Sequence, residues 1–152
     1  MSWLRIKTVV RRHWYVLWRS PNRWFDIAVW PVFDPRLPKD LWKGGLAISG
    51  LYDLEPVRLC YVNDKLGLDE TGARRLSPLL NIPRQSNPLL VAYGTGELPE
   101  LQRQSQEFAT AWTRRGLPGR LAALEGHNHF TILEELARPE GALTALVKDL
   151  VT

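Results

Sequence analysis

The sequence is poor in cysteine and histidine. One cysteine, Cys60, and three histidines occur among its 152 residues. A single cysteine excludes an intramolecular disulfide, and without a Cys/His cluster a structural zinc site is not expected. We interpret Cys60 as a small buried hydrophobic residue in a chain from a reducing compartment, the cytoplasm. No residue pattern indicates a cofactor or a metal ion.

The sequence also lacks a long apolar run. No stretch approaches the roughly 18 residues that a membrane-spanning helix requires. The start of the chain lacks the continuous apolar core of a signal peptide. We therefore expect a chain that neither crosses a bilayer nor is exported by that route.

Acidic residues are missing from the first 25 positions. This segment holds six of the 20 Lys and Arg residues, whereas residues 26–152 hold fourteen bases against sixteen acids. The net charge of +4 therefore originates near the N-terminus. We treat residues 1–36, which are basic and rich in tryptophan, as one region and residues 37–152 as a second. A Pro-rich, charged stretch at 35–43 marks their boundary.

Residues 4–19 have the periodicity of an amphipathic helix, with apolar side chains on one face and arginines on the other. A basic helix rich in tryptophan suits the headgroup region of a membrane, so we expect peripheral membrane contact through residues 1–25. The equally favoured alternative is a helix that docks on its own domain and keeps a solvated basic face. Nucleic-acid binding is not expected, because no reading motif accompanies the charge.

The most informative stretch is 88–105, PLLVAYGTGELPELQRQS. An apolar, β-prone run from Leu89 to Tyr93 lies between a proline and the Gly94-Thr95-Gly96 turn, which predicts a buried strand. The turn is followed by a carboxylate, Glu97. Pro99 then suits the first position of a helix, where its missing N–H costs nothing. The stretch therefore predicts a strand, a glycine turn, an acid and a helix.

The rest of the second region alternates strands with helices, which indicates an α/β fold with parallel strands. The expected strands are Gly44–Ser49, Leu89–Tyr93 and Arg120–Leu124. The expected helices are one or two turns within Glu55–Val62, a short helix from an Asp69 N-cap to Arg75, Glu100–Arg115 closed by Gly116, and an amphipathic end at Pro139–Val151.

An acid and a histidine follow successive strands of this pattern. Glu97 comes after one strand, and His129 lies in the loop after the next, so the two side chains can meet in space. A carboxylate bonded to an imidazole Nδ1–H leaves Nε2 free as a base. Taken singly, Glu97 fits a solvated loop acid and His129 a helix-start or core histidine. His127 is the nearest competitor for the base, and we expect it to face solvent.

Residues 11–34, RRHWYVLWRSPNRWFDIAVWPVFD, resemble the cytoplasmic N-terminal segment of ATP-binding-cassette exporter permeases. In that family the W-P-V-x-D-like turn at Trp30 to Asp34 leads into a long apolar span. Here a Pro-rich, charged stretch follows Asp34 instead. The departure removes transport, and the resemblance implies at most an interfacial anchor.

A second resemblance covers residues 37–152. Three blocks carry it: KGGLAISGLYDLEP (43–56), the 88–105 stretch and NHFTIL (128–133). Together they resemble the C-terminal half of α/β-hydrolases of the esterase and kynurenine formamidase type. The resemblance implies a truncated α/β-hydrolase fold, a few parallel strands with flanking helices, in which Glu97 takes the place of the triad acid and His129 that of the triad histidine.

The nucleophile of such a triad is missing from the sequence. The family places it in a G-x-S-x-G elbow upstream of the Gly44 block, and no serine here has glycine at both second-neighbour positions. Ser49 comes closest, and we interpret it as a turn hydroxyl. We therefore expect a hydrolase-family domain for small esters or amides that is inactive alone. The alternative is a non-catalytic membrane-surface or protein-interaction module that uses the basic N-terminal helix.

Loss of the upstream half would also expose one edge of the predicted sheet. The Gly44–Ser49 strand is interior in the complete family fold, and its free backbone groups here would invite pairing. The segment Trp24–Phe33 is rich enough in β-prone and aromatic residues to cover it. We expect the first forty residues either to cover this edge or to leave the chain to self-associate.

Overall fold

The computed structural model describes residues 43–151. The chain divides into two units, residues 1–34 and 35–152, and every described residue belongs to the second. The expected N-terminal helix, the exporter-like segment and the edge-covering segment Trp24–Phe33 lie outside the described residues. Within residues 43–151, no helix is long and apolar enough to cross a membrane.

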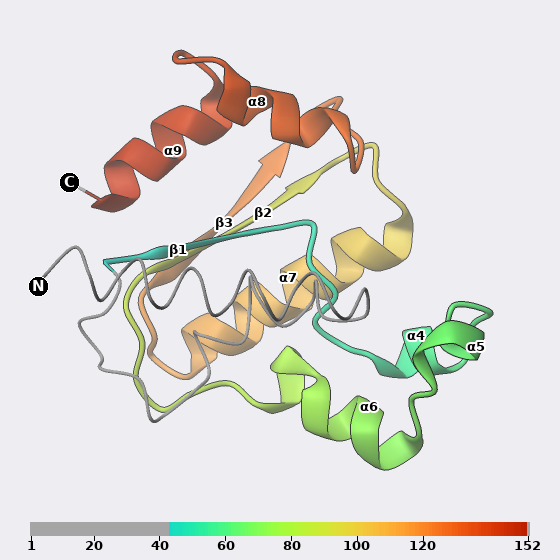
Figure 1. Ribbon diagram of the computed structural model, residues 1–152. Helices are drawn as coiled ribbons and strands as arrows, with labels where there is room; N and C mark the ends of the chain where they lie inside the picture. Colours follow the sequence, from blue (N-terminus) through green and yellow to red (C-terminus); the bar gives the residue numbers. More distant parts are fainter. Residues whose placement is uncertain (1–42, 152) are drawn as a thin grey trace, which may run out of the picture. The chain divides into compact units, whose positions relative to one another are not determined.

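A parallel sheet with the order β1-β2-β3 forms the centre of the described unit (Figure 1). Its strands are β1 (Gly45–Ile48), β2 (Leu89–Gly94) and β3 (Gly119–Leu124). All six residues of β2 are buried, which explains its unbroken apolar sequence, because a central parallel strand is covered on both faces. The predicted fold class and all three strands are confirmed, with ends that differ by one residue.

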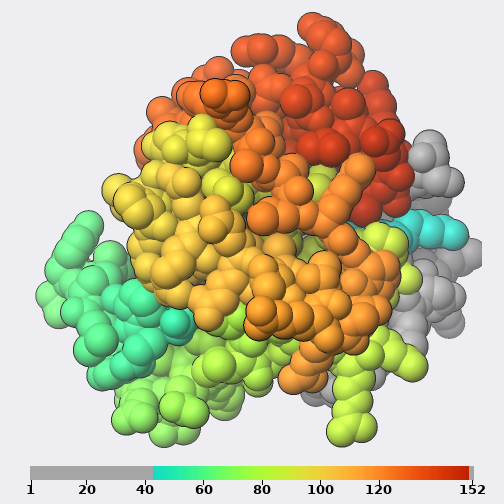
Figure 2. All heavy atoms as spheres, turned by 180° about the vertical axis from the view of Figure 1, so that it is seen from behind, coloured from blue at the N-terminus to red at the C-terminus, as the bar shows by residue number. Residues whose placement is uncertain are grey.

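Helices cover the two faces of the sheet. The long helix α7 (Pro99–Arg114) joins β2 to β3 and packs on both strands (Figure 1). After β3 come the 3-10 helix η3 (Thr131–Leu133), α8 (Glu134–Ala137) and α9 (Ala142–Val151). One apolar cluster joins Ala92 and Leu124 of the sheet to Ile132 and Leu143, so η3 and α9 lie on the face opposite α7. Seen from behind in Figure 2, α7 runs across the middle of the visible face.

Four short elements connect β1 to β2. They are α4 (Glu55–Arg58), α5 (Asn63–Leu66), α6 (Glu70–Leu76) and the 3-10 helix η2 (Pro78–Leu80). The Asp69 side chain accepts a hydrogen bond from the Gly72 N–H at 2.6 Å, which confirms the predicted N-cap of α6.

The prediction that Cys60 is buried is wrong. Its side chain is exposed in the turn between α4 and α5, where Leu59 and Tyr61 are also 69% and 84% exposed. The Cys60 thiol donates only to the Val57 carbonyl, 3.3 Å away. The two short helices present this turn to solvent, so an apolar residue type here does not indicate the core.

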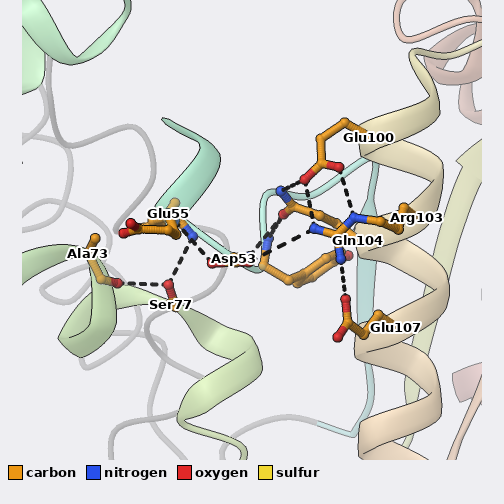
Figure 3. A network of polar contacts seen from close by, with 10 residues as sticks. Asp53, Glu55, Ala73, Ser77, Glu100, Arg103, Gln104 and Glu107 are labelled. Atoms are coloured by element: carbon orange, nitrogen blue, oxygen red, sulfur yellow. Dashed lines mark hydrogen bonds and ion pairs between the residues drawn. The ribbon is translucent and has the colours of Figure 1, made fainter. Parts of the chain in front are cut away.

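A buried glutamine on α7 holds the segment that leaves β1. Gln104 is fully buried, and its Oε1 accepts hydrogen bonds from the backbone N–H groups of Tyr52 (2.7 Å) and Asp53 (2.9 Å) (Figure 3). Its amide nitrogen donates to Glu100 one turn earlier at 2.9 Å. Gln104 thus satisfies two backbone donors that no strand partner reaches, and it ties the L-Y-D-L segment to α7.

Aromatic packing reinforces the same junction. The ring of Tyr52 stacks on Phe108 with centroids 4.1 Å apart, and Phe108 contacts Trp112 one turn further along α7. Burial raises the pKa of the Tyr52 phenol well above its usual value, an effect that the nearby backbone of Gly50 reduces and the charge of Glu97 increases. Tyr52 therefore stays neutral and serves as a core residue.

The Gln104 contacts generate a stability prediction. Gln104→Ala should lower the free energy of unfolding by roughly 2–4 kcal/mol, because it leaves two buried backbone N–H groups without an acceptor. Gln106→Ala is the matched control on the same helix. It removes one half-buried bond, 2.7 Å from the Tyr93 hydroxyl, and should cost about 1 kcal/mol or less. Urea denaturation of the full chain measures both, and equal losses would contradict the assigned role of Gln104.

Candidate active site

The three strands deliver polar side chains to one edge of the sheet. Ser49 directly follows β1, Glu97 lies three residues beyond β2, and His129 lies five residues beyond β3. Because the strands are parallel, their carboxyl ends meet at the same edge, which is where open α/β sheets bind ligands. The site is therefore assembled from three loops that are distant in sequence.

Glu97 and His129 lie side by side at this edge. The distance from His129 Nδ1 to Glu97 Oε2 is 3.7 Å, so the predicted proximity of the two residues is confirmed. The separation exceeds the 2.7–3.2 Å of a hydrogen bond. The Glu97 side chain is inaccessible, whereas that of His129 is 49% exposed. The imidazole thus faces a buried carboxylate on one side and solvent on the other.

The two oxygens of the Glu97 carboxylate differ in their hydrogen-bond partners. Oε1 accepts the Gly94 N–H at 2.9 Å and a short hydrogen bond from the Ser49 hydroxyl. Oε2 is buried and has no hydrogen-bond partner among the described residues. A buried carboxylate requires donors or an opposite charge to offset its desolvation. The orientation therefore leaves Oε2 as the oxygen that can accept a hydrogen bond from His129 Nδ1–H.

The backbone of the Glu97 loop is a tight turn. The Glu97 N–H donates to the Gly94 carbonyl at 3.1 Å, and the Thr95 N–H donates to Leu124 at the end of β3 at 3.0 Å. Gln102 of α7 reaches back and donates to the carbonyls of Thr95 (3.0 Å) and Glu97 (2.7 Å). These bonds fix the acid between β2 and α7.

The histidine loop is shaped by Asn128. Its side-chain oxygen accepts the N–H groups of Phe130 (2.9 Å) and Thr131 (3.0 Å), while the Thr131 hydroxyl accepts the Asn128 N–H at 2.9 Å. This reciprocal capping starts η3 and places His129 in the turn just before it. Asn128 and Thr131 of the N-H-F-T sequence therefore determine the shape of the loop that carries His129.

The Glu97 loop and the histidine loop are in close contact at two glycines. The Gly96 N–H donates to the His127 carbonyl at 2.9 Å. A β-carbon on Gly94 would lie 2.1 Å from the same carbonyl oxygen, a distance at which atoms overlap. Glycine at position 94 is therefore required for the close approach of the loop that carries the histidines.

His127 does not face solvent, so that prediction is wrong. Its side chain is 25% exposed, and Nε2 lies 3.7 Å from Oε1 of the buried Glu135. The Glu135 carboxylate also accepts the Ala142 N–H at the start of α9 at 2.7 Å and contacts Arg138 at 3.3 Å. Glu135 thus links the histidine loop to α9. The local sequence carries no signal for this pair, because the partner lies eight residues away beyond η3.

Ser49 is more than a turn hydroxyl. It is buried, has a φ of 51°, and its hydroxyl donates to Glu97. No serine in residues 43–151 is hydrogen-bonded to His129: Ser77 donates to Ala73, Ser86 donates to Asn87, and the Ser105 hydroxyl is buried without a partner. The described residues therefore hold an acid and a histidine, without a serine placed as their nucleophile. Among them, no group of three or more Cys, His, Asp or Glu could hold a metal ion.

The chain is similar to curated kynurenine formamidases from two fish. It is 32% identical over 114 residues to the kynurenine formamidase of Danio rerio, a match that covers 72% of this chain and 39% of the relative. For the kynurenine formamidase of Salmo salar, the values are 34% over 111 residues, 69% and 38%. The chain therefore spans about two fifths of the length of these relatives. No family model matches the sequence.

Solved structures with a similar fold are hydrolases. A candidate thioesterase from Silicibacter sp. TM1040 superposes with a TM-score of 0.65 at 28% identity, over 77% of this chain and 44% of that protein. Residues 43–151 form part of an α/β-hydrolase fold. An acetyl ester-xyloside bifunctional hydrolase from Caldicellulosiruptor lactoaceticus has the same fold, with a TM-score of 0.55 at 16% identity over 70% of this chain and 40% of its own.

These similarities support the hydrolase resemblance derived from the three sequence blocks. None of these similar proteins is an exporter, so the exporter resemblance of residues 11–34 stays a prediction. The catalytic roles of Glu97 and His129 also stay predictions, because proximity at the sheet edge is a necessary condition for them and not a measurement of activity.

The overlap at Gly94 generates a prediction for the site. Gly94→Ala should lower the free energy of unfolding by roughly 1–3 kcal/mol, because the new methyl group must displace the His127 carbonyl. Gly72→Ala is the control, since its β-carbon meets chiefly the end of the Asp69 side chain and alanine favours the helix; it should change stability by about 1 kcal/mol or less. Thermal or urea unfolding compares the two, and a neutral Gly94→Ala would contradict the tight loop contact.

Proposed function

We propose that this chain supplies the acid and the base of a Ser-His-Glu hydrolase site that acts on carboxylic esters or aryl formamides, and that it is inactive by itself. The observation that carries the proposal is the pairing of a buried carboxylate with a half-exposed imidazole, Glu97 Oε2 to His129 Nδ1 at 3.7 Å. The pair lies at the carboxyl edge of an α/β-hydrolase sheet, where such sites occur. The names of the similar fish proteins support aryl formamides as one substrate class.

The proposed chemistry follows from the two faces of the imidazole. Glu97 accepts a hydrogen bond from Nδ1–H and thereby selects the tautomer in which Nε2 is an unprotonated base. When Nε2 takes a proton from a nucleophile, the buried carboxylate stabilises the imidazolium formed. The same Nε2–H then protonates the leaving alcohol or amine. The exposed side of His129 leaves room for a nucleophile and a substrate.

Two parts of the reaction have no candidate in this chain. A nucleophile elbow of the form G-x-S-x-G does not occur in the sequence, and the family resemblance places both this elbow and the oxyanion-hole loop upstream of the Gly44 block. Ser49 is a poor substitute because its hydroxyl is committed to the Glu97 carboxylate. The histidine therefore has nothing to activate in the isolated chain.

A chimera tests the proposal. Residues 43–151 would replace the matching segment of the Danio rerio kynurenine formamidase, and hydrolysis of formylkynurenine and p-nitrophenyl acetate would be measured. The chimera should be active, and Glu97→Ala or His129→Ala should each reduce kcat at least about a thousandfold, because triad members act as a unit. The full chain alone should give only background hydrolysis.

The controls separate folding from chemistry. Circular dichroism and size-exclusion chromatography establish that the chimera and both variants are folded. A folded chimera without activity, or with activity that survives His129→Ala, would contradict the proposed roles. Turnover by the full chain alone that His129→Ala abolishes would contradict its inactivity and would require a nucleophile elsewhere in the chain.

We propose as a second function that the chain binds membrane surfaces through residues 1–25. The favouring observation is the charge of this segment, six bases and no acid. The full chain should sediment with vesicles that contain phosphatidylserine and stay in solution with phosphatidylcholine alone, since each basic residue near an anionic surface contributes about 1 kcal/mol. Replacement of the six bases by glutamine is the control. Binding that survives this replacement, or about 0.5 M salt, would contradict an electrostatic mode.

A further inference from the structure

Ser49 has an unusual backbone conformation at the edge of the site. It is the one non-glycine residue in the described part of the chain with a positive φ, 51°. A β-carbon makes this left-handed region unfavourable, and residues held there cluster at functional sites when the surrounding structure forces the conformation on them. Glycine would remove the strain at no steric cost, yet the chain has serine at this position.

The contacts of Ser49 show what enforces the conformation. Its N–H donates to the Ala92 carbonyl at 2.8 Å and continues the β1–β2 ladder by one residue. Beyond it, Gly50 lies against the Tyr52 ring so closely that a β-carbon would be 2.6 Å from the ring carbon Cζ. Gln104 in turn binds the backbone of Tyr52. The chain must therefore turn sharply at residue 49, and the turn directs the hydroxyl inward.

The inward hydroxyl has one partner, the Glu97 carboxylate. The bond joins residues 48 apart in sequence, and both are buried, so it is a tertiary contact and not the local bond of a turn serine. It converges on Oε1 together with the Gly94 N–H. With two donors on Oε1, the carboxylate cannot rotate its oxygens without breaking both bonds, and Oε2 is kept toward His129 Nδ1.

We propose that Ser49 is a positioning residue that orients the Glu97 carboxylate toward His129. This inference rests on the proposed function, because it assigns a purpose to the Glu97–His129 pair. Ser49 acts through Glu97 and is not itself the nucleophile. The inference explains why the hydroxyl is present at a position whose backbone geometry favours glycine.

The tautomer of His129 is a direct measure of this orientation and does not require activity. Long-range proton–nitrogen NMR spectra of the ¹⁵N-labelled full chain distinguish the Nδ1–H from the Nε2–H form of a neutral imidazole, and His129→Gln assigns the signals. The wild-type chain should favour Nδ1–H. Ser49→Gly should reduce the ratio of Nδ1–H to Nε2–H by roughly fivefold, the effect expected from losing one hydrogen bond.

Two further variants separate positioning from stability. Ser49→Thr keeps the hydroxyl but adds a branched β-carbon at positive φ, so it should lower the melting temperature and leave the tautomer ratio near that of the wild type. Ser77→Ala removes a buried serine hydroxyl away from the site, whose bonds go to Ala73 and Leu54, and should also leave the ratio unchanged. If the ratio followed stability across these variants, Ser49 would have only a structural role and the inference would be overturned.

Glu97→Ala distinguishes a failure of the positioning role of Ser49 from a failure of the proposed function. If it abolishes the Nδ1–H preference while Ser49→Gly does not, the acid–histidine pair stands and the positioning role of Ser49 is wrong. If Glu97→Ala leaves the preference unchanged, the pair itself is wrong and the proposed function falls with it. A loss of preference in both Glu97→Ala and Ser49→Gly, with retention in Ser49→Thr, supports the inference.

Discussion

Burial of the Glu97 carboxylate constrains the positions of all three loops at the carboxyl ends of the strands. A carboxylate that is inaccessible to water must be surrounded by donors or paired with a cation. Here the donors come from the end of β1, through Ser49, and from the end of β2, through Gly94, while the loop after β3 brings His129 alongside. Each of the three strands thus contributes one contact, and the relative positions of all three are needed to satisfy a single side chain.

The helix α7 makes this convergence possible by holding two loops at once. Gln102 binds the carbonyls of the Glu97 loop, and Gln104 binds the backbone that leaves β1. The apolar stripe of the same helix, with Phe108 and Trp112 buried, presses it against the sheet. Burial of its apolar face fixes the position of α7, and the hydrogen bonds of Gln102 and Gln104 then fix the two loops relative to the helix. A helix bound through its apolar face alone would leave these loop backbone groups unsatisfied.

Residues 43–151 form part of an α/β-hydrolase fold, and the chain spans about two fifths of the length of its curated relatives. In the described sheet, β1 is an outer strand, so the backbone groups of its far side face no other described strand. Covering of this edge by residues 24–33, like self-association through it, stays a prediction because that segment lies outside the described part.

Local sequence determined the secondary-structure elements and the proximity of Glu97 and His129. Apolar runs bounded by Pro and Gly predicted β2 within one residue, Asp69 predicted a cap, and the order acid then histidine after successive strands predicted that Glu97 and His129 meet. These predictions succeed because hydrophobic period and turn residues are properties of short segments, and because alternation of strands with helices implies parallel strands whose carboxyl ends lie together. They did not predict that Ser49 binds Glu97, that His127 pairs with Glu135 or that Cys60 is exposed. Tertiary structure decided these features, because each depends on which distant segment packs against the residue. A buried polar contact stabilises the fold only when both partners are in place, and the sequence around one residue does not identify its distant partner.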